Sequence, residues 1–541
     1  MKNQTRHNIL AGCAALSLLL MSACSESWDD HYLPDSGITP TASIWDLIEA
    51  EPSLSQFKTI LEQTPVYANN KVSGVTYATL LAADQTLTVW APVNGSFNLD
   101  SIQALLATSS GKALVEKNMV KNHLTRYAVS LSPSTNKEIM LLNQKVKHLT
   151  ISSFGEVPIT TANIMASNGV LHLVGGTASY LPSIYEGVLS DTAISQVGAF
   201  LKAYQKDSLD EKASVAAGIV DGKTIYVDSV TIPKNALLSE FGYINNEDSS
   251  YWMIAPTNAA WKAAYEKVLP YFNFSYTENA DTMQRFWTQK ALLRDLIFNT
   301  RAQASPNDSL LSTAYRPTQV GKHVYQKPFE AGGILSDVKE QITCSNGVIY
   351  KVDKWPFTLQ ETFFQPIKVE AEHEATILKS ANCSFNFRSV SSGDLSNKGY
   401  LDVVPLQASS QPSVTFQINN TLAGKYDICV VCAPQTVYRT PFTHADSLDI
   451  FRPYKFRATL SYTDRRGTSK NYTGGGKTFI NDPYALDTVC VAEAFEFPTC
   501  SYNREDVTVT LTIQVYVLTR ENDLYNREMF IDCIYLRPRE D

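Results

Sequence analysis

The 541-residue sequence predicts two α+β regions followed by an all-β sandwich. The first observation behind this is a pair of motifs that occurs twice, in residues 87–174 and again in residues 251–352. The second is a change after Gln365, where helical periodicity fades and strand-like runs separated by turns take over. The third is length, because a chain of this size needs more than one hydrophobic core. We therefore expect α+β regions at 43–185 and 186–360 and a sandwich at 365–541.

Residues 1–23 indicate a lipoprotein signal peptide. Lys2 and Arg6 give a positively charged start, and the apolar run from Ile9 to Leu20 is shorter than the roughly 20 residues of a membrane-spanning helix. The run ends in LMSAC (20–24), which resembles a bacterial lipobox. Cleavage after Ala23 would leave Cys24 to carry diacylglycerol and an added acyl chain such as palmitate, which together give stable anchoring. An ordinary secretory signal with an incidental Cys24 is the alternative.

Residues 24–42 are expected to form a linker with an acidic start. The stretch SESWDD (25–30) resembles the export signal of surface lipoproteins in glycan-harvesting gut bacteria. That resemblance implies an outer-membrane lipoprotein that faces the cell exterior. A charged, solvated spacer would have the same composition, so this alternative stays open.

Composition limits the partners. The formal net charge is −8, and removal of a leader that carries Lys2 and Arg6 would leave −10. Such a surface repels phosphate backbones, which argues against nucleic acid. Apolar residues make up 44% and charged residues 18% of the chain, as in ordinary folded proteins. Wholesale disorder is therefore excluded.

The repeat consists of two motifs in the same order. LTVWAPVNGSF (87–97) recurs as YWMIAPTNAAW (251–261), and each copy predicts a strand, a proline-broken turn and a helix capped by Asn94 or Asn258. ASNGVLHLV (166–174) matches CSNGVIYKV (344–352). In these, Asn-Gly predicts a tight turn before a strand, because both residues accept positive φ.

This pattern resembles the fasciclin (FAS1) family, whose signature boxes are Ala-Pro-x-Asn-x-x-aromatic and the Asn-Gly strand. MVKNHL (119–124) is similar to the family's central helix with its histidine, His123, and residues 292–298 take that place without a histidine. Tyr350 likewise replaces His172, so the second copy is the divergent one. The resemblance implies a compact α+β fold, a twisted β-sandwich with helices along one side, used mainly for adhesion and extracellular binding.

Residues within the two boxes have a structural interpretation. We expect Asn94, Asn168, Asn258 and Asn346 to be turn and cap residues that form the fold rather than ligand contacts. We expect His123 and His172 to be hydrogen-bonded histidines of the core or its edge rather than metal ligands.

The last third of the chain predicts a β-sandwich. Strand-like runs lie at 414–418, 427–431, 455–462 and 507–517, and the last alternates polar and apolar residues throughout. VEAE (369–372), LAGKYDI (422–428) and FIDCIYL (530–536) resemble the opening, central and closing strands of carbohydrate-binding jelly rolls of the galactose-binding type.

The resemblance to these jelly rolls implies a structural calcium, since in some of them an early glutamate and the closing aspartate hold one. We expect Glu370, Glu372 and Asp532 to fill that role, because carboxylate oxygens suit calcium and the first and last strands of such rolls are adjacent. A solvated acidic strand end is the alternative. No other cofactor is expected.

Sugar binding usually needs exposed aromatic rings, and the sandwich has no tryptophan. Its expected loops do carry other aromatic residues and an arginine, for each of which surface packing or core filling is the alternative. The candidate ligand-binding residues are Tyr438, Arg439, Phe442, Tyr472, Tyr484 and Tyr525.

The nine cysteines do not form a regular framework. In CVVC (429–432) the odd offset along a strand directs Cys429 and Cys432 to opposite faces. We expect buried cysteines that act as small hydrophobic residues, although disulfides stay possible in this compartment.

No catalytic motif stands out, so we expect a binding protein and not an enzyme. The leading hypothesis is a surface-exposed, lipid-anchored protein that captures a polysaccharide or oligosaccharide beside an outer-membrane transporter. The alternative is a fasciclin-type adhesion or protein-assembly lipoprotein with a structural C-terminal sandwich.

Overall fold

The computed structural model of the chain describes residues 40–68, 71–209, 215–220, 223–228, 231–276, 279–301, 303–313, 323–391, 393–438 and 451–540. The chain divides between Leu181 and Pro182 into two compact units, called here the N-terminal and the C-terminal unit. Cys24 and the acidic stretch after it lie outside the described residues. Within the described part, no helix has the length and apolar character needed to cross a bilayer.

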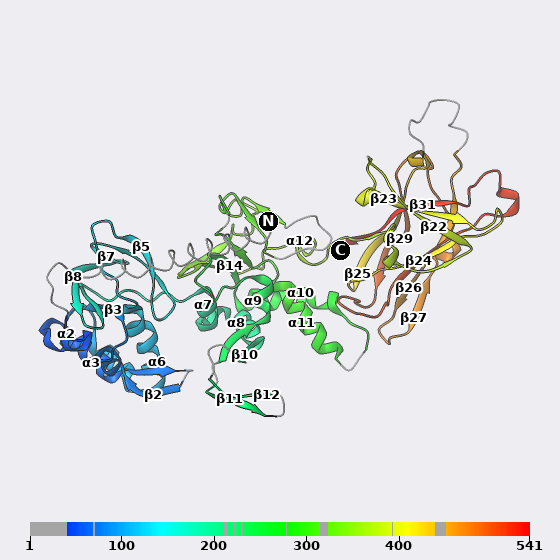
Figure 1. The fold of residues 1–541 in the computed structure, drawn as a ribbon. Helices are drawn as coiled ribbons and strands as arrows, with labels where there is room; N and C mark the ends of the chain where they lie inside the picture. Colours follow the sequence, from blue (N-terminus) through cyan, green and yellow to red (C-terminus); the bar gives the residue numbers. More distant parts are fainter. Residues whose placement is uncertain are drawn as a thin grey trace, which may run out of the picture. The chain divides into compact units, whose positions relative to one another are not determined.

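The N-terminal unit is built on one seven-stranded sheet with helices beside it (Figure 1). The strand order is β4-β3-β9-β8-β7-β6-β5, and β3 and β9 run parallel. The helices are α2 (Ile44–Ala50), α3 (Ser55–Gln63), α4 (Tyr77–Ala82), α5 (Leu99–Leu106) and α6 (Ser109–Val115). The strands are β3 (Leu87–Pro92), β4 (Leu124–Arg126), β5 (Asn136–Met140), β6 (Val146–Thr150), β7 (Ser153–Phe154), β8 (Val157–Ala166) and β9 (Gly169–Val174), besides a hairpin of β1 (Pro65–Ala68) and β2 (Lys71–Thr76).

Residues 182–358 repeat this plan, and we call them the second α+β region. Their four-stranded sheet has the order β15-β14-β19-β18, which corresponds to β4-β3-β9-β8. The strands are β14 (Tyr251–Pro256), β15 (Ile297–Asn299), β18 (Val338–Cys344) and β19 (Gly347–Val352), and β14 and β19 are parallel. The helices are α7 (Ile184–Ser190), α8 (Ser195–Ala203), α9 (Ala236–Phe241), α10 (Asn258–Val268) and α11 (Ala280–Leu293). The shared sheet order confirms the internal repeat that the paired motifs predicted.

The Asn-Gly motif has the same structural role in both copies. Asn168 accepts a 2.8 Å bond from the Ile44 amide at the start of α2, and Asn346 accepts one of 2.8 Å from the Ile184 amide at the start of α7. Positive φ is confined to the glycine of each pair, so the expectation that both residues adopt it was wrong. A Cβ at Gly169 would lie 1.8 Å from the Leu87 carbonyl oxygen, so only glycine fits beside the parallel strand. The asparagine therefore contributes buried side-chain hydrogen bonds, and the glycine contributes the positive φ.

Asn94 and Asn258 are also structural residues, but they are not helix caps. Thr257 caps α10, and Asn98 caps α5, so the predicted capping role was assigned to the wrong residues. Asn94 Oδ1 accepts from the Gln56 amide at 2.9 Å, and Asn258 Oδ1 accepts from the Gln196 amide at 2.9 Å. Each asparagine therefore ties the end of a central strand to the start of the second helix of its copy.

Both candidate histidines are hydrogen-bonded in the N-terminal unit, as predicted. His123 is fully buried, and its Nε2 accepts from the Ala178 amide at 2.9 Å while Nδ1 lies 2.8 Å from the Met119 carbonyl. His172 accepts at Nδ1 from the Asn163 amide at 3.2 Å, and its Nε2 lies 2.9 Å from the Val129 carbonyl. With both ring nitrogens occupied by backbone groups, these side chains have no position left for a metal ion.

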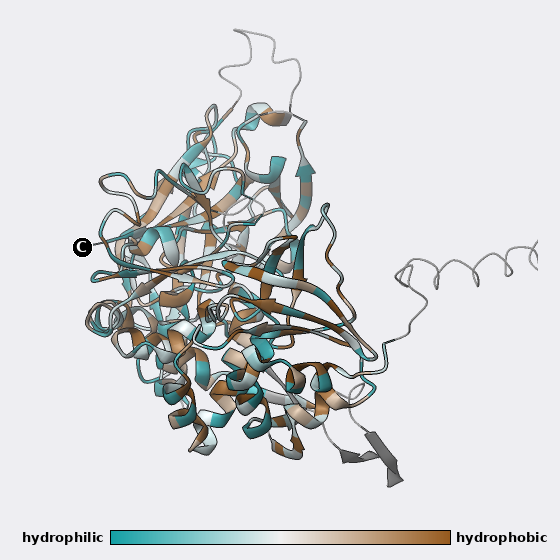
Figure 2. Ribbon diagram, turned by 90° about the vertical axis from the view of Figure 1, so that its left-hand side faces the viewer, coloured by the Kyte–Doolittle hydropathy of each residue, from teal (hydrophilic) through white to brown (hydrophobic). Residues whose placement is uncertain are grey.

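Residues 367–540 form the C-terminal sandwich, in which two six-stranded sheets pack around buried apolar residues. Hydrophobic and hydrophilic residues are interspersed along the strands (Figure 2). One sheet has the order β22-β23-β31-β25-β29, with β20 beside β31, and the other has β21-β24-β30-β26-β27, with β28 beside β26. The strands are β20 (Ile367–Glu370), β21 (Ile377–Ala381), β22 (Cys383–Ser389), β23 (Gly399–Pro405), β24 (Ser413–Gln417), β25 (Gly424–Cys432), β26 (Lys455–Thr463), β27 (Ser469–Tyr472), β28 (Phe479–Ile480), β29 (Asp487–Phe497), β30 (Thr510–Val515) and β31 (Met529–Arg539). The mixed α+β character and the sandwich-like sheets agree with the predicted fold class.

The two cysteines of the CVVC motif do face opposite ways on β25. Cys432 is buried in the core, whereas Cys429 forms a disulfide with Cys490, directly across from it on β29. The expectation of simple buried thiols therefore holds for Cys432 and fails for Cys429. Cross-strand register decides the pairing, because Cys429 and Cys490 are partners on neighbouring antiparallel strands.

The second α+β region and the sandwich share one hydrophobic core inside the C-terminal unit. Backbone hydrogen bonds join segment 271–276 to the sandwich: the Ala423 amide donates to the Tyr271 carbonyl at 2.9 Å, and the Cys500 amide donates to the Asn273 carbonyl at 2.7 Å. The Tyr271 ring also packs on Phe364 with a centroid distance of 4.8 Å. These contacts bring side chains of the two regions together at one place.

Candidate binding pocket and cation site

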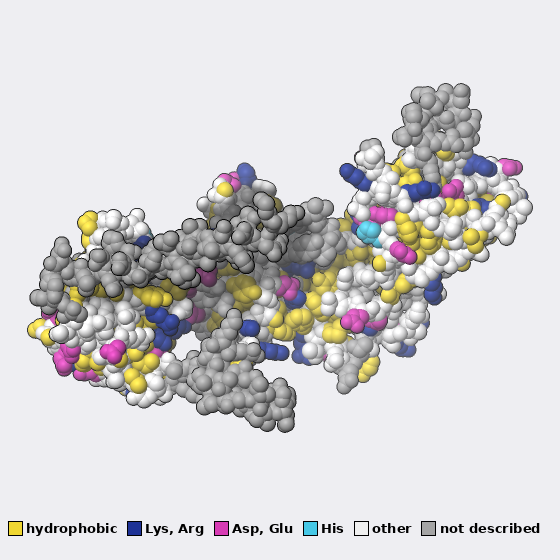
Figure 3. Space-filling view, viewed as in Figure 1, with side chains coloured by type: hydrophobic (Ala, Val, Ile, Leu, Met, Phe, Trp, Pro, Cys, Tyr) yellow, Lys and Arg dark blue, Asp and Glu magenta, His cyan; other side chains and the backbone are white. Residues whose placement is uncertain are grey.

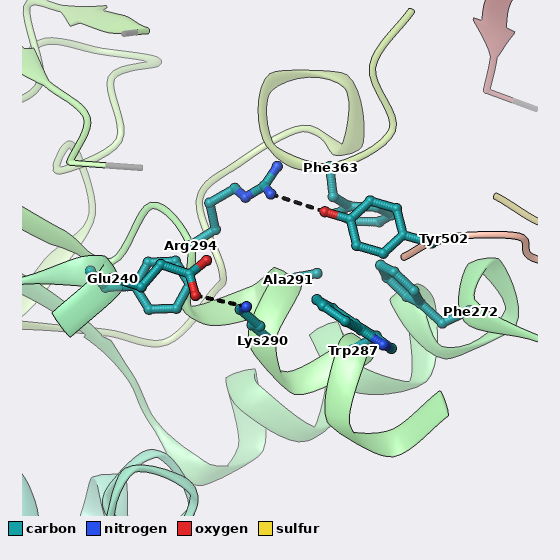
Figure 4. Close-up of a pocket in the computed structure, with 9 residues that line it drawn as sticks. Glu240, Phe272, Trp287, Lys290, Ala291, Arg294, Phe363 and Tyr502 are labelled. Atoms are coloured by element: carbon teal, nitrogen blue, oxygen red, sulfur yellow. Dashed lines mark hydrogen bonds and ion pairs between the residues drawn. The ribbon is translucent and has the colours of Figure 1, made fainter. Parts of the chain in front are cut away.

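A pocket lies where the second α+β region meets the sandwich (Figure 4). It is a hollow partly open to solvent rather than an enclosed cavity. The helices contribute most of its lining, and Tyr502 is the one sandwich residue in it. The lining residues are Glu240, Phe241, Phe272, Trp287, Lys290, Ala291, Arg294, Phe363 and Tyr502.

Aromatic rings form one side of the pocket. The Trp287 and Tyr502 rings meet edge to face with centroids 5.0 Å apart, and Phe272 meets Tyr502 in the same way at 5.8 Å. Phe363 follows the short helix α12 (Leu359–Thr362), and its ring centroid lies 5.5 Å from that of Phe272. Phe272 and Phe363 are buried, whereas Trp287 and Tyr502 are partly exposed. The partly exposed rings are therefore the ones that a ligand could contact.

Charged side chains lie beside these rings, and Ala291 lies between Arg294 and Trp287 (Figure 4). Lys290 Nζ lies 2.7 Å from a Glu240 carboxylate oxygen and 4.8 Å from the centroid of the Trp287 ring. Arg294 donates from Nη1 to the Thr362 carbonyl at 3.1 Å and from Nη2 to the Tyr502 hydroxyl at 3.3 Å. The pocket thus combines ring faces with directed hydrogen-bond donors, the mixture that polar organic ligands require.

The geometry of one helix explains how the charged and aromatic groups come together. Trp287, Lys290, Ala291 and Arg294 are spaced i, i+3, i+4 and i+7 along α11 and its C-terminal cap, so they share a face. None of these four residues was predicted from the sequence as a site residue. That spacing of one aromatic and two basic residues was the available signal, but nothing local indicates that Tyr502 completes the site.

The structure brings together Glu370 and Asp532 of the three predicted calcium ligands, and Glu372 lies near enough for its charge, in addition to burial, to raise the pKa of Asp532. β20 pairs with β31, so Glu370 lies opposite Cys533 and next to Asp532. Asp532 accepts from the Ser396 amide at 2.9 Å, Glu370 accepts from the Ser396 hydroxyl at 2.7 Å, and Glu372 accepts from Asn397 Nδ2 at 2.9 Å. Loop 396–397 therefore bridges the opening and closing strands.

The donor set at these carboxylates fits a hard cation. Glu370 Oε2 and Glu372 Oε2 are both buried without a hydrogen-bond partner, which is costly unless a cation neutralises them. Burial, together with the negative charges of Glu370 and Glu372, raises the pKa of Asp532 to about 7. Cys533 lies within ligand distance of the group, but burial raises the pKa of its thiol. A protonated thiol is a poor ligand, so carboxylate oxygens and calcium match best.

The aromatic loop residues predicted for glycan binding are only partly gathered. Tyr484 and Tyr525 lie at the same end of the sandwich, because segment 453–454 contacts the neighbours of both. The Asn526 amide donates to the Pro453 carbonyl at 2.8 Å, and the Tyr454 amide donates to Asn481 Oδ1 at 2.8 Å. Both rings are half-buried, and Lys455 Nζ lies 4.8 Å from the Tyr525 centroid. Arg439, Phe442 and the Tyr438 side chain lie outside the described residues.

Tyr472 lies away from that loop end. It pairs with Leu460, five residues further along β26 than Lys455, and its ring packs on Phe495 with a centroid distance of 5.1 Å. Figure 3 shows hydrophobic side chains interspersed with charged ones over the visible face of the sandwich. Among the described residues, the loop end therefore holds the half-buried Tyr484 and Tyr525, and their role in glycan binding stays a prediction.

One acidic pair in the sandwich contains a carboxyl group with a raised pKa. Burial and the nearby Asp402 charge, to which Glu528 is hydrogen-bonded, raise the pKa of Glu528 to about 7. Glycosidases hold their two carboxyl groups at least about 5 Å apart so that a sugar or water fits between them. A directly hydrogen-bonded pair leaves no such space. Arg388 Nη2, 3.3 Å from Asp402, further indicates a structural cluster.

No protein-family model matches the chain, and no curated protein matches its sequence. Among solved structures, a FAS1 domain pair from the insect cell adhesion molecule fasciclin I is 12% identical, with a TM-score of 0.20, over 51% of this chain and 90% of that one. A xylan-binding domain of CBM22 is 11% identical, with a TM-score of 0.19, over 31% of this chain and 92% of that one. A Clostridium thermocellum xylanase 10B fragment with CBM22-1 and GH10 modules has a TM-score of 0.19 at 10% identity, over 33% of this chain and 27% of that one. A FAS1 domain pair and a carbohydrate-binding module are thus among the solved structures to which parts of the chain are similar.

Proposed function

We propose that the protein is a surface lipoprotein, anchored through Cys24, that captures carbohydrate beside an outer-membrane uptake system. The observation that carries the proposal is the pocket in which the rings of Trp287 and Tyr502 lie beside Lys290 and Arg294. Carbohydrate sites pair an aromatic ring, which contacts the C–H face of a pyranose, with polar groups that bind its hydroxyls. Both elements are present, and the tryptophan that the sandwich lacks is supplied by α11.

The cation site has a supporting role in this proposal. A calcium ion held by Glu370, Glu372 and Asp532 would neutralise three neighbouring carboxylates and join the opening and closing strands of the sandwich. The same strands and loop 396–397 would then be fixed without any direct contact to sugar. Calcium here serves stability, and the pocket serves recognition.

The test is binding of the purified full chain to a panel of neutral and acidic polysaccharides, followed by Trp287→Ala. We expect saturable binding that falls at least about fivefold in this variant, since stacking on a ring contributes about 1–3 kcal/mol. Tyr276→Ala is the matched control, because Tyr276 is 86% exposed and does not line the pocket.

Two outcomes would count against the proposal. Absence of binding across the whole panel would overturn carbohydrate capture and favour the adhesion alternative. Binding that survives Trp287→Ala but is lost in Tyr484→Ala or Tyr525→Ala would move the site to the loop end of the sandwich.

A further inference from the structure

The charged side of the pocket is not electrically balanced. Lys290 is neutralised by Glu240 at 2.7 Å, whereas Arg294 forms no ion pair with any carboxylate of the described residues. Its partners are a carbonyl oxygen and a phenolic hydroxyl, both uncharged. Within the part of the chain that the structure describes, the pocket therefore carries one positive charge without a carboxylate partner, in a chain whose net charge is −8.

We propose that this pocket selects a carboxylate-bearing sugar, such as a hexuronate unit of an acidic polysaccharide, over the corresponding neutral sugar. The inference rests on the proposed carbohydrate-binding function and names its ligand class. Of the five N–H groups of a guanidinium, the bonds to Thr362 and Tyr502 use two, so Arg294 keeps donors for a two-point contact with a carboxylate. Charge-assisted pairs of this kind are about twice as strong as neutral hydrogen bonds.

The two bonds that Arg294 makes also fix its position. They connect α11 with Thr362 and with Tyr502, so the guanidinium is held in place before a ligand arrives, and little side-chain freedom is lost on binding. Ala291, whose side chain is small, lies between Arg294 and Trp287, while the guanidinium contacts the Tyr502 hydroxyl directly (Figure 4). A uronate could then place its carboxylate at Arg294 and its C–H face on the exposed parts of Trp287 and Tyr502.

One feature opposes an anion here. Arg294 caps the C-terminal end of α11, where the carbonyl groups give the helix a partial negative charge. That effect acts over the last turn and is weaker than a two-point charged hydrogen bond. The overall negative charge of the protein also disfavours long polyanions, so short acidic units are expected to bind better than long polyuronates.

The test compares trigalacturonate with its methyl ester, which keeps the sugar and removes the charge, by calorimetry on the full chain. We expect the acid to bind at least about tenfold more tightly, and Arg294→Gln to remove this preference while changing ester affinity less than about threefold. Arg294→Lys should keep part of the preference. Arg285→Gln removes a charge from an exposed position on the same helix and should change nothing.

A second measurement does not depend on how well the variants fold. If Arg294 binds the carboxylate, the preference of the unaltered chain for the acid should shrink as salt is raised from about 0.05 M to about 0.5 M. Equal affinity for acid and ester, or a preference unaffected by Arg294→Gln, overturns the inference but leaves carbohydrate capture intact. Absence of binding to both, and to the rest of the panel, overturns the proposed function itself.

Discussion

Arg294 donates a hydrogen bond of 3.3 Å to the hydroxyl of Tyr502, which lies 208 residues later in the chain. The bond connects the end of α11 to a loop of the C-terminal sandwich, next to the backbone bond between Cys500 and Asn273. The pocket therefore exists only where the second α+β region and the sandwich are packed together. Its binding function depends on that packing, which makes the junction itself open to test.

The sandwich should lose stability when it is separated from the second α+β region. A fragment of residues 362–540 lacks Tyr271, Phe272 and Trp287, so Phe364 would lose one aromatic partner and keep Tyr426, and Tyr502 would lose both of its partners. We expect it to melt about 10 °C or more below a fragment of residues 182–540, measured by circular dichroism. Equal melting temperatures would show that the junction adds nothing to the fold.

Asn168→Ala should destabilise the N-terminal unit selectively. Its side-chain amide accepts from the Ile44 amide at 2.8 Å and donates to the Leu81 carbonyl at 2.8 Å, both buried, and to the Ala83 carbonyl at 2.6 Å, which is partly buried. Loss of these bonds leaves buried polar groups unsatisfied, which costs about 3 kcal/mol. Hydrogen exchange of the full chain should show faster opening of residues 44–174 and unchanged opening of residues 184–352.

Two controls make the asparagine comparison decisive. Asn346→Ala removes the equivalent bonds of the second copy and should affect the C-terminal unit instead. Asn136→Ala alters an exposed strand residue and should have little effect on either unit. If either buried-asparagine variant loosened both units equally, the two compact units would not be independent.

The N-terminal unit should become less stable as pH falls from about 6.5 to about 4. Burial lowers the pKa of His123 to about 4, so the folded state resists protonation that the unfolded chain accepts near pH 6.5. The stabilisation is therefore fully present above the pKa of about 6.5 that the histidine has in the unfolded chain. By pH 4 the free energy of unfolding has fallen by about 3 kcal/mol. The lowered pKa of His172, also caused by burial, acts in the same direction.

Hydrogen exchange of residues 44–174 between pH 4 and pH 7.5, corrected for the intrinsic exchange rate, would measure this loss. His123→Asn should flatten the pH dependence, whereas His148→Gln, which alters an exposed histidine of the same unit, should leave it unchanged. A pH dependence that persists undiminished in His123→Asn would show that another group controls acid stability.

Local patterns predicted the repeat because each motif encodes its own strand and turn. The parallel β3–β9 and β14–β19 pairs were not predicted, because they join strands that lie far apart in the chain. The same reasoning assigned helix capping to Asn258, although Thr257 is chemically able to cap and does so. The pocket could not be predicted, because Trp287 and Tyr502 meet only through the docking of segment 271–276 on the sandwich. Adjacency of the first and last strands, expected from the jelly-roll resemblance, did bring Glu370 and Asp532 together.

Removal of calcium should lower the melting temperature of the C-terminal unit. Three close carboxylates, two of them with a buried unpartnered oxygen, repel one another unless a cation lies between them. Calcium at about 100 times its dissociation constant would add about 2.7 kcal/mol to the free energy of unfolding. Calorimetry of the full chain in EDTA, and again after excess calcium, measures the difference.

Asp532→Asn should abolish the response to calcium, whereas Glu493→Gln, at an exposed position on β29, should preserve it. Identical melting with EDTA and with calcium would instead establish that these carboxylates are held by hydrogen bonds and proton uptake alone.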